Sequence, residues 1–349
     1  MTDRLALVTG AGGWLGRRFV QTLMHGLPDD PRFSADGERR VRCLVLPGED
    51  TSALAALGSQ VELVEGDVRD AASVSGFMRG GEGATVFHIA GVVHPKRFVR
   101  EFYEVNETGT RHVVEAARDA GVRRLVHVSS NSPIGCNPRA DHEFDESAPY
   151  HPYMNYGKSK KRAEEIVLAA NGALETVVIR PPWFYGPYQP PRQTQFFTMI
   201  KNGGMPLLGK GTNRRSMAYV DNICQGLRLC EQVEAAKGQA YWIADARPYP
   251  MHEIIDTVER LMETEFGIEV AHKRMKLPSI VGDIALGVDI AVQGVGLYHQ
   301  KFHVLSEMNK TIACSIGKAR AELGYEPKVD LEEGMRRSIR WVLEQGIQI

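Results

Sequence analysis

The sequence predicts an α/β protein built on a doubly wound parallel sheet, with a smaller C-terminal lobe. Short runs of β-branched and other apolar residues alternate with helical stretches through the first half of the chain. A glycine-rich turn follows the first apolar run, and two prolines end the last one at Arg180. Strands that alternate with crossover helices pair in parallel and are covered on both faces. We therefore expect residues 1–187 to form mainly the sheet domain. Residues 188–349 should form mainly the second lobe, with some segments returning to the sheet.

The predicted elements follow one another along the chain as strand and helix. The expected strands are Leu5–Thr9, Val41–Leu46, Val61–Val64, Thr85–Ile89, Leu125–Ser129 and Thr176–Ile179, and the expected helices are Trp14–His25, Val105–Ala120, Tyr156–Ala170, Asn222–Glu234 and Met251–Glu265. The polar stretch Pro28–Arg40 is expected to be a long surface loop, since Pro, Asp and Gly are typical of such segments.

Composition excludes several functional classes. The chain of 349 residues has a net charge of −1, so it lacks the basic surface that nucleic-acid binding requires. Its five cysteines are scattered without a CxxC pair, which argues against a disulfide framework or a metal site and favours a reducing cytoplasm. The opening segment MTDRLALVTG enters a strand at once, so no signal peptide is expected. The sequence thus predicts a cytoplasmic protein without an integral membrane span.

The turn after the first strand has the spacing of a phosphate-binding loop. Gly10, Gly13 and Gly16 stand in the pattern G-x-x-G-x-x-G, and a helix begins at Trp14 and Leu15. The first glycine permits a tight turn, the second lets the backbone approach a pyrophosphate, and the third permits close packing of helix on strand. The helix N-terminus adds N–H groups and the positive end of the helix dipole. We therefore expect a Rossmann-type site for a dinucleotide.

The sequence leaves the choice between NAD and NADP open. NAD enzymes usually place an acidic residue at the end of the second strand, and NADP enzymes place an arginine nearby. Here the strand runs into Pro47 and Gly48, Glu49 comes slightly late, and Arg17 and Arg42 are candidates for a 2′-phosphate. Because no arginine ends the strand, NAD is the expected cofactor and NADP the alternative.

A tyrosine and a lysine lie one helical turn apart at the start of a predicted helix. Tyr156 and Lys160 stand at positions i and i+4, so both project from one face. A tyrosine hydroxyl has a pKa near ~10, and a nearby ammonium stabilises the phenolate and lowers that pKa. Tyr156 can then accept a proton from an alcohol as hydride leaves its carbon. Ser130, just after the strand Leu125–Ser129, can donate to the same substrate oxygen. A solvated helix face and a plain turn are the alternatives.

Taken together, these motifs resemble the extended short-chain dehydrogenases/reductases over nearly the whole chain. The matching segments are TGAGGWLG, GDVRD, HIAG, VNETGT, HVSS, YGKSK, RPPWFYGP, YVDN and GKARAELGYEPKVDLEEGMRRSIRW. The resemblance implies an enzyme in which Tyr156 is the catalytic acid/base, Lys160 its partner and Ser130 the serine of the triad. The family usually carries a tyrosine shortly after that serine, but Pro133 and Ile134 occupy the region here.

The resemblance also implies which residues contact the two ligands. Asp67 is placed to meet the adenine amino group, although capping the next helix is an equal alternative for it. The prolines of RPPWFYGP are expected to turn the chain over the nicotinamide. The expected cofactor contacts are Gly10, Gly13, Trp14, Leu15, Gly16, Asp67, Val68, Ala90, Gly91, Asn106, Tyr156, Lys160 and Pro182, and the expected substrate contacts are Ser130, Asn131, Trp183, Tyr185 and Arg215.

Two substrate classes compete. Family members that act on nucleotide sugars (epimerases, dehydratases and reductases) carry an arginine four residues before the YVD tyrosine, where it binds the diphosphate. Arg215 stands at that position, and a guanidinium suits a diphosphate through bidentate contacts. The 3β-hydroxysteroid and sterol dehydrogenase group shares the segment SKKRAEEIVLAANG. Because Arg215 is the more specific feature, we expect a nucleotide-sugar enzyme. A sterol-type dehydrogenase and a non-catalytic dinucleotide sensor are the alternatives.

The apolar stretch Ile280–Leu297 is the second feature shared with the sterol group, whose members contact membrane or lipid there. Asp283 and Asp289 interrupt it, so a membrane span is not expected. We expect a buried helix, with a lid over an apolar ligand as the alternative. The partner is expected to be a small-molecule substrate, and a homodimer stays open.

Overall fold

The computed structural model describes residues 5–349. Its central sheet has seven strands in the order β13-β8-β7-β6-β1-β4-β5, and every neighbouring pair is parallel. The doubly wound parallel sheet predicted from the sequence is therefore confirmed. The strands are β1 (Leu5–Thr9), β4 (Arg40–Val45), β5 (Val61–Glu65), β6 (Thr85–His88), β7 (Arg124–Val128), β8 (Glu175–Arg180) and β13 (Ala240–Trp242).

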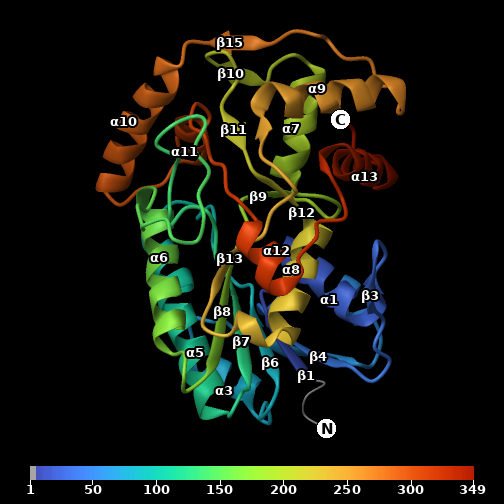
Figure 1. Ribbon diagram of the computed structural model, residues 1–349, viewed down its shortest axis with the longest axis vertical. Coiled ribbons are helices and arrows are strands. Elements are labelled where there is room, and N and C mark those ends of the chain that lie inside the picture. Colours follow the sequence, from blue (N-terminus) through green and yellow to red (C-terminus); the bar gives the residue numbers. More distant parts are fainter. Residues whose placement is uncertain (1–4) are drawn as a thin grey trace.

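Helices cover both faces of the sheet (Figure 1). The reason is visible in β1, whose successive side chains point to opposite faces. Leu7 packs in the apolar cluster that contains Phe77 of α3, whereas Ala6 and Val8 pack in the cluster that contains Phe19 of α1. One face carries α3 (Ala71–Met78), α5 (Thr110–Asp119) and α6 (Met154–Ala169), and the other carries α1 (Trp14–His25) and α8 (Val220–Gln232).

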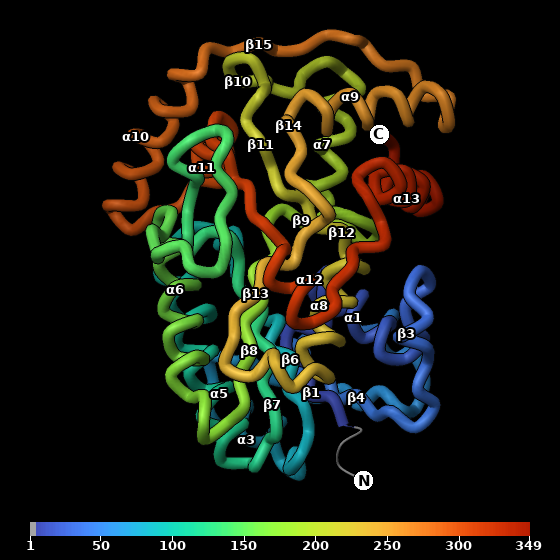
Figure 2. The backbone as a smooth tube through the Cα atoms, viewed as in Figure 1, coloured from blue at the N-terminus to red at the C-terminus, as the bar shows by residue number. Residues whose placement is uncertain are grey.

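The second lobe lies over the carboxyl ends of the strands. β8 ends at Arg180, directly before the two prolines. Figure 2 shows the chain returning from this lobe to the sheet at β13. The helices of the lobe are α7 (Pro191–Lys201), α9 (Met251–Thr264), α10 (Ile280–Gly294), α11 (Gln300–Glu307) and α13 (Leu331–Glu344), and its strand pairs are β9 (Trp183–Tyr185) with β12 (Met217–Tyr219), β10 (Pro206–Leu208) with β15 (Met275–Leu277), and β11 (Arg214–Arg215) with β14 (Tyr249–Pro250).

The long surface loop expected at Pro28–Arg40 is wrong. An antiparallel hairpin of β2 (Gly26–Leu27) and β3 (Asp30–Ser34) takes up its first part, and residues 35–39 remain outside any strand or helix. The polar composition of this segment did not indicate that it packs against the core. Its Asp30 is buried and accepts hydrogen bonds from Arg32 and Gln225 at 2.7 Å each. Paired charges thus let a polar sequence form a strand against the core.

The helix expected over Val105–Ala120 is interrupted. A short α4 (Arg100–Phe102) leads into a π-helical segment, η2 (Tyr103–Gly109), and only then does α5 begin. The widened turn contains the fully buried Asn106. π-Helical turns inside helices often mark functional sites.

The expectation that the Ile280–Leu297 segment is buried is also wrong. The segment does form a helix, α10, but Ile284 within this helix is 61% exposed. Val295, the first residue after the helix, is 74% exposed. Its inner face instead carries Asp289 and Gln293, which are buried. The helix therefore presents polar residues to the protein and apolar residues outward. Among residues 5–349, no helix combines the length and the apolarity that crossing a membrane requires.

Candidate active site

The phosphate loop has the shape that its glycines predict. Gly10 has φ +70°, and a Cβ there would lie 2.6 Å from the backbone nitrogen of Ala90. A Cβ at Gly16 would lie 2.0 Å from the carbonyl oxygen of Gly10, so neither position accepts a side chain. Gly13 is exposed, and the nearest atom to a Cβ there is 3.3 Å away. The loop therefore leaves open space outside Gly13, next to the N-terminus of α1, where a pyrophosphate fits.

Ala90 and Gly91, which are also expected to contact the cofactor, follow β6. This segment lies beside β1, where the strand order of the sheet reverses. Ligands of doubly wound sheets bind in the crevice at such a reversal. Asn106 holds this segment by accepting a hydrogen bond from Val92 N at 2.8 Å and donating to Val92 O at 3.0 Å. A Cβ on Gly91 would lie 3.3 Å from Asn106 Oδ1 and 3.9 Å from Lys160 Nζ. Three expected cofactor residues (Gly91, Asn106 and Lys160) thus meet at one place.

Glu49 lies closer to the phosphate loop than its sequence position suggested. A turn after β4 bonds Glu49 N to Leu46 O at 3.1 Å, and Glu49 Oε2 accepts from Leu46 N. The carboxylate folds back so far that a Cβ on Gly12 would come within 2.3 Å of it. Arg42 points elsewhere, toward Glu62 at 2.7 Å. Arg17, the other arginine considered for a 2′-phosphate, stays at the loop and donates from Nη2 to Gly12 O at 3.2 Å, so the Glu49 carboxylate and a guanidinium both lie beside Gly12.

Asp67, which was considered both for contact with adenine and as the cap of the next helix, does not cap that helix. The Asp67 carboxylate accepts from Arg69 at 2.6 Å, and this hydrogen bond lowers the pKa of Asp67. Asp70, not Asp67, caps α3 by accepting from Ala72 N. Val68 is buried against α5, and its carbonyl accepts from a histidine of that helix, His112, at 2.9 Å.

Tyr156, Lys160 and Ser130 meet at the carboxyl ends of the strands. Tyr156 and Lys160 are buried in the first two turns of α6, and Ser130 follows β7. Burial raises the pKa of Tyr156 to about 12, while a hydrogen bond with Ser130 acts to lower it. Burial lowers the pKa of Lys160 to about 8. The three residues that the sequence grouped by resemblance are therefore close together.

Two buried histidines beside Lys160 were missed by the sequence reasoning. Lys160 Nζ lies 3.3 Å from His127 Nε2, and burial, reinforced by the Lys160 charge, lowers the pKa of His127. His88 stacks near His127 and bonds Thr9 at 2.7 Å and Thr110 at 2.9 Å. A neutral His127 can accept a hydrogen bond from the ammonium. Both histidines stand inside the motifs HIAG and HVSS, which was the available signal.

The surroundings of Tyr156 are aromatic and aliphatic. Its ring lies 5.6 Å from Phe102, and Tyr298 packs edge-on against Phe102 at 5.4 Å. Val92, Val93, Val99 and Tyr103 are packed against these three rings. Tyr298 enters from the connection between α10 and α11, so the second lobe completes this apolar enclosure.

The prolines and aromatic residues that follow β8 lie in two different environments. Pro182 is buried and Trp183 is partly exposed, with Phe196 at 5.4 Å from the latter. The expectation that Tyr185 lines the substrate pocket is wrong. Tyr185 is 2% exposed, and its hydroxyl donates to Asp245 at 2.7 Å in the core between the lobes. Tyr185 therefore packs in the core instead.

The remaining expected substrate contacts are Asn131 and Arg215. Asn131 Oδ1 accepts from Ser130 Oγ at 3.3 Å, so its amide lies beside the triad. Arg215 is 8% exposed, and its Nη2 donates to the carbonyl oxygen of Glu307 at the end of α11. Among residues 5–349 no carboxylate forms an ion pair with Arg215. Part of its guanidinium thus holds a helix end, a role that the sequence did not show.

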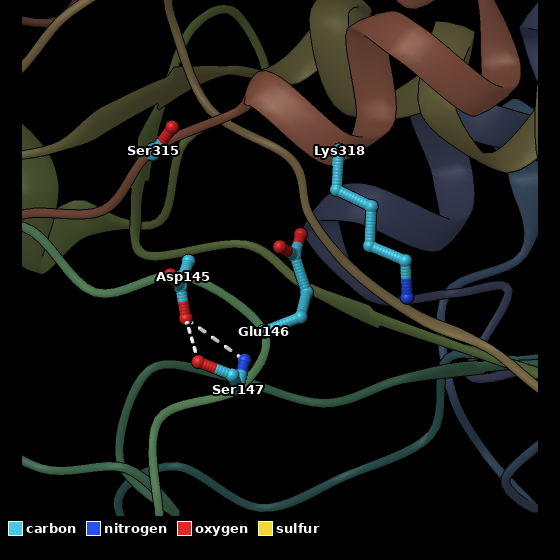
Figure 3. Close-up of a pocket in the computed structure, with 5 residues that line it drawn as sticks. All are labelled: Asp145, Glu146, Ser147, Ser315 and Lys318. Atoms are coloured by element: carbon cyan, nitrogen blue, oxygen red, sulfur yellow. Dashed lines mark hydrogen bonds between the residues drawn. The ribbon is translucent and has the colours of Figure 1, made fainter.

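A cavity elsewhere on the surface does not belong to this site. Figure 3 shows its lining: Asp145, Glu146, Ser147, Ser315 and Lys318. Asp145 accepts from Ser147, Glu146 accepts from the backbone of β13, and Lys318 donates to Gln239 at 2.7 Å. These charged groups satisfy the edge of the sheet and point to no ligand.

Comparison with known proteins identifies the family. The model of the 3-beta hydroxysteroid dehydrogenase/isomerase family matches residues 7–278. The chain belongs to this family. It is an enzyme of the extended short-chain dehydrogenase/reductase type, so the resemblance inferred from its motifs is confirmed.

Relatives match the chain almost from end to end. It is 50% identical to the uncharacterized protein y4nL of Sinorhizobium fredii, over 98% of this chain and 96% of that protein. It is 30% identical to 3beta-hydroxysteroid-dehydrogenase/decarboxylase isoform 1 of Arabidopsis thaliana, over 97% and 79%. Among solved structures, the dTDP-glucose 4,6-dehydratase DesIV of Streptomyces venezuelae, with NAD and TYD bound, superposes with a TM-score of 0.73. It shares 27% identity and 97% coverage of each chain.

Proposed function

We propose that this enzyme interconverts a secondary alcohol and a ketone by hydride transfer with NAD, on an apolar ring-bearing substrate of the 3β-hydroxysteroid type. The observation that carries the substrate class is the enclosure of Tyr156 by Phe102, Tyr298 and three valines. An apolar ring buries surface against these side chains, whereas a diphosphate or sugar would meet the hydroxyls of Tyr103 and Tyr298 already bonded to Asn155 and His94. The sterol-type alternative of the sequence thus becomes the leading proposal.

The cofactor proposal rests on the phosphate loop and on Glu49. The open space outside Gly13 accepts a pyrophosphate, and a carboxylate above Gly12 suits the ribose hydroxyls of NAD while repelling a 2′-phosphate. The similar dehydratase DesIV was crystallised with NAD. When bound, the dinucleotide supplies the acceptor or donor of the hydride and, when oxidised, a positive charge.

The roles of the chain's own residues follow from their positions. In the oxidative direction, Tyr156 takes the hydroxyl proton of the substrate as the hydride leaves the same carbon, and the C–O bond becomes a carbonyl. We assign to Lys160 the stabilisation of the phenolate by charge, with its ammonium held at the end of β7 by Val128 O. Ser130 donates to the substrate oxygen and keeps it near Tyr156. In the reductive direction the same proton returns to the carbonyl oxygen.

Oxidation of a 3β-hydroxysterol tests this proposal. The parent should form NADH, and Tyr156→Phe should keep cofactor binding but lose ~10²–10⁴ in turnover, the usual contribution of a positioned acid–base group. Tyr188→Phe, which removes a hydroxyl far from α6, is the matched control. Failure of the parent to bind or turn over any 3β-hydroxysterol or its ketone would overturn the substrate class.

A nucleotide sugar is the second candidate, and Arg215 is the observation that favours it. Its guanidinium is nearly buried and unpaired with any described carboxylate, and hydrogen bonds to charged groups are worth roughly 1.5–3 kcal/mol. If the ligand is a nucleotide sugar, Arg215→Ala should weaken UDP binding about tenfold to a hundredfold. If it is a sterol, the same change should leave sterol affinity unaltered, and the parent should not bind UDP.

A further inference from the structure

The hairpin of α10 and α11 reaches the residue that precedes Tyr156. Gln293, near the end of α10, accepts two hydrogen bonds through its side-chain oxygen from Asn155. One comes from the backbone nitrogen at 3.2 Å and one from the side-chain amide at 2.9 Å. Figure 1 shows α10 and α11 beside the end of α6 where this contact lies. The second lobe therefore holds the first turn of the helix that carries Tyr156.

The amide of Gln293 is fixed in orientation by a buried carboxylate. Gln293 Nε2 donates to both oxygens of Asp289 at 3.0 Å, and His303 of α11 bonds the same carboxylate at 2.9 Å. Only the NH2 group of an amide can donate, so Gln293 must direct its oxygen at Asn155. All three residues are at most 5% exposed. An unpaired carboxylate there would be costly, so the arrangement is specified by the need to satisfy Asp289.

Asn155 is also held from the opposite side, and the chain before it is strained. Tyr103 of the π-helical segment donates to Asn155 Oδ1 at 2.7 Å. Met154, the first residue of α6, has φ +54°, a left-handed conformation that a non-glycine residue keeps only when its surroundings hold it. Asn155 thus stands between a strained residue and Tyr156, with hydrogen bonds to two separate elements.

We propose that Gln293 is a positioning residue for catalysis: acting through Asn155, it holds the first turn of α6 so that Tyr156 faces Ser130. The inference rests on the proposed function, because it takes Tyr156 as the group that transfers the proton. The hairpin also carries Tyr298 onto Phe102, so one element both closes the apolar enclosure and orients the tyrosine. Loss of the hydrogen bonds from Gln293 should therefore affect turnover more than binding.

Substitution of Gln293 tests this in the full-length protein with NAD and the alcohol substrate. Gln293→Ala should lower kcat about tenfold to a hundredfold and change KM and NADH affinity less than about threefold, because small misplacements of reacting groups cost rate. Gln300→Ala, an exposed glutamine at the start of α11, is the matched control and should behave as the parent. If Gln293→Ala does not fold, Gln293→Met keeps the side-chain volume, removes both sets of hydrogen bonds and carries the same expectation.

A charge-swapped pair separates hydrogen bonding from packing. Gln293→Glu alone places a second carboxylate against Asp289 and should lower kcat at least as much as Gln293→Ala. In the double variant with Asp289→Asn, the new glutamate accepts from Asn155 and the new asparagine donates to the glutamate. The kcat should therefore recover most of the loss. A folded, NADH-binding double variant that recovers nothing would overturn the proposal.

A readout independent of substrate keeps this inference distinct from the proposed function. Tyrosine labelled at Cζ, with Tyr156→Phe used to assign the signal, reports the ionisation of Tyr156 in the NAD complex by NMR. The groups that act on this hydroxyl are Ser130, Glu307 and Tyr298, and none of them is substituted in Gln293→Ala. The titration midpoint should move in Gln293→Ala and stay in Gln300→Ala. If the sterol is not turned over but the midpoint moves, only the substrate proposal fails. An unmoved midpoint together with parental kcat overturns the positioning role.

Discussion

Lys160 donates a hydrogen bond to the carbonyl oxygen of Val128 at 2.7 Å, which anchors the lysine to the end of β7. Ser130 follows that strand after one intervening residue. The side chains of Lys160, from α6, and Ser130, from the loop after β7, are therefore tied to the same strand end. A shift of β7 relative to α6 would disturb both of them together.

The first prediction concerns the charge of Lys160. Burial lowers its pKa to about 8, so the ammonium is present below that pH and is lost as the pH rises through it. Because kcat/KM reports the free enzyme, it should fall in the parent as the pH passes about 8. Lys160→Ala should lower both dinucleotide affinity and turnover and abolish this limb. Lys158→Ala, an exposed lysine of the same helix, should retain the parental profile.

Gly13 should be required for the binding of NAD(H) but not for the folding of the protein. Its backbone, with φ −72° and ψ 171°, is accessible to any residue, and a side chain there would occupy the space left for the phosphates. Gly13→Val should therefore abolish NAD(H) binding in a titration while leaving the melting temperature near that of the parent. Gly37→Val, at a position with open space around it, is the control. Parental NAD affinity in Gly13→Val would show that the cofactor lies elsewhere.

The two adjacent serines after β7 should behave differently. Ser130 interacts with Tyr156 and Asn131, whereas Ser129 Oγ is buried and has no hydrogen-bond partner within residues 5–349. Ser130→Ala should reduce turnover by ~10²–10³, the effect of removing one donor to a developing oxyanion. Ser129→Ala should leave turnover unchanged. Steady-state assays of the two variants check this, and equal losses would mean that the serine has been assigned wrongly.

Glu49 should set the preference for NAD over NADP. Its carboxylate overhangs Gly12, where it would repel a 2′-phosphate. Glu49→Ala should narrow the preference by about tenfold, equivalent to about 1.4 kcal/mol. Asp50→Ala, which loses only a cap on the next turn, should not change the ratio. Both affinities can be measured by titration, and an unchanged ratio in Glu49→Ala would assign the preference to other residues.

Asp245 should make stability depend on pH. Burial raises its pKa from 3.8 to about 7, although Tyr219 N, Tyr185 and Asn222 all donate hydrogen bonds to it. The folded state therefore holds this proton more tightly than the unfolded state, and the free energy of unfolding falls as the pH rises from 3.8 to about 7.

Asp245→Asn should remove this dependence, amounting to roughly 2–4 kcal/mol over the window. Urea unfolding of parent and variant at several pH values measures it. Asp119→Asn, at an exposed aspartate that pairs with its neighbour Arg118, is the control. Equal pH slopes in parent and Asp245→Asn would contradict the raised pKa.

Elements whose ends are set by residues close by in the sequence could be predicted. Trp14–His25 begins and ends as expected, because the glycine loop and the apolar spacing leave one reading of that segment. The strand Asp30–Ser34 was missed because its buried Asp30 is satisfied in part by Gln225, which lies far away in the sequence. Long-range partners of this kind have no local signature.

The same limit applies to the candidate site. The grouping of Ser130, Tyr156 and Lys160 could be expected because strand ends and helix starts meet at one edge of a parallel sheet. The outward apolar face of α10 could not, since it depends on the buried contact of Asp289 with His303. The helix-end contact of Arg215 likewise depends on where α11 packs.

The position of Trp14 gives the protein an optical signal of its own. The indole N–H donates to Pro187 O at 2.7 Å, and the ring lies 5.2 Å from Phe184, so a residue of the phosphate loop bridges the two lobes. Indole fluorescence is sensitive to polarity, to hydrogen bonding and to nearby quenching groups. The chain has four tryptophans, so the emission of Trp14 is obtained as the difference between the parent and Trp14→Phe. That difference reports changes at the seam between the lobes, and reduced nicotinamide, which accepts excitation energy, can be followed without an attached dye.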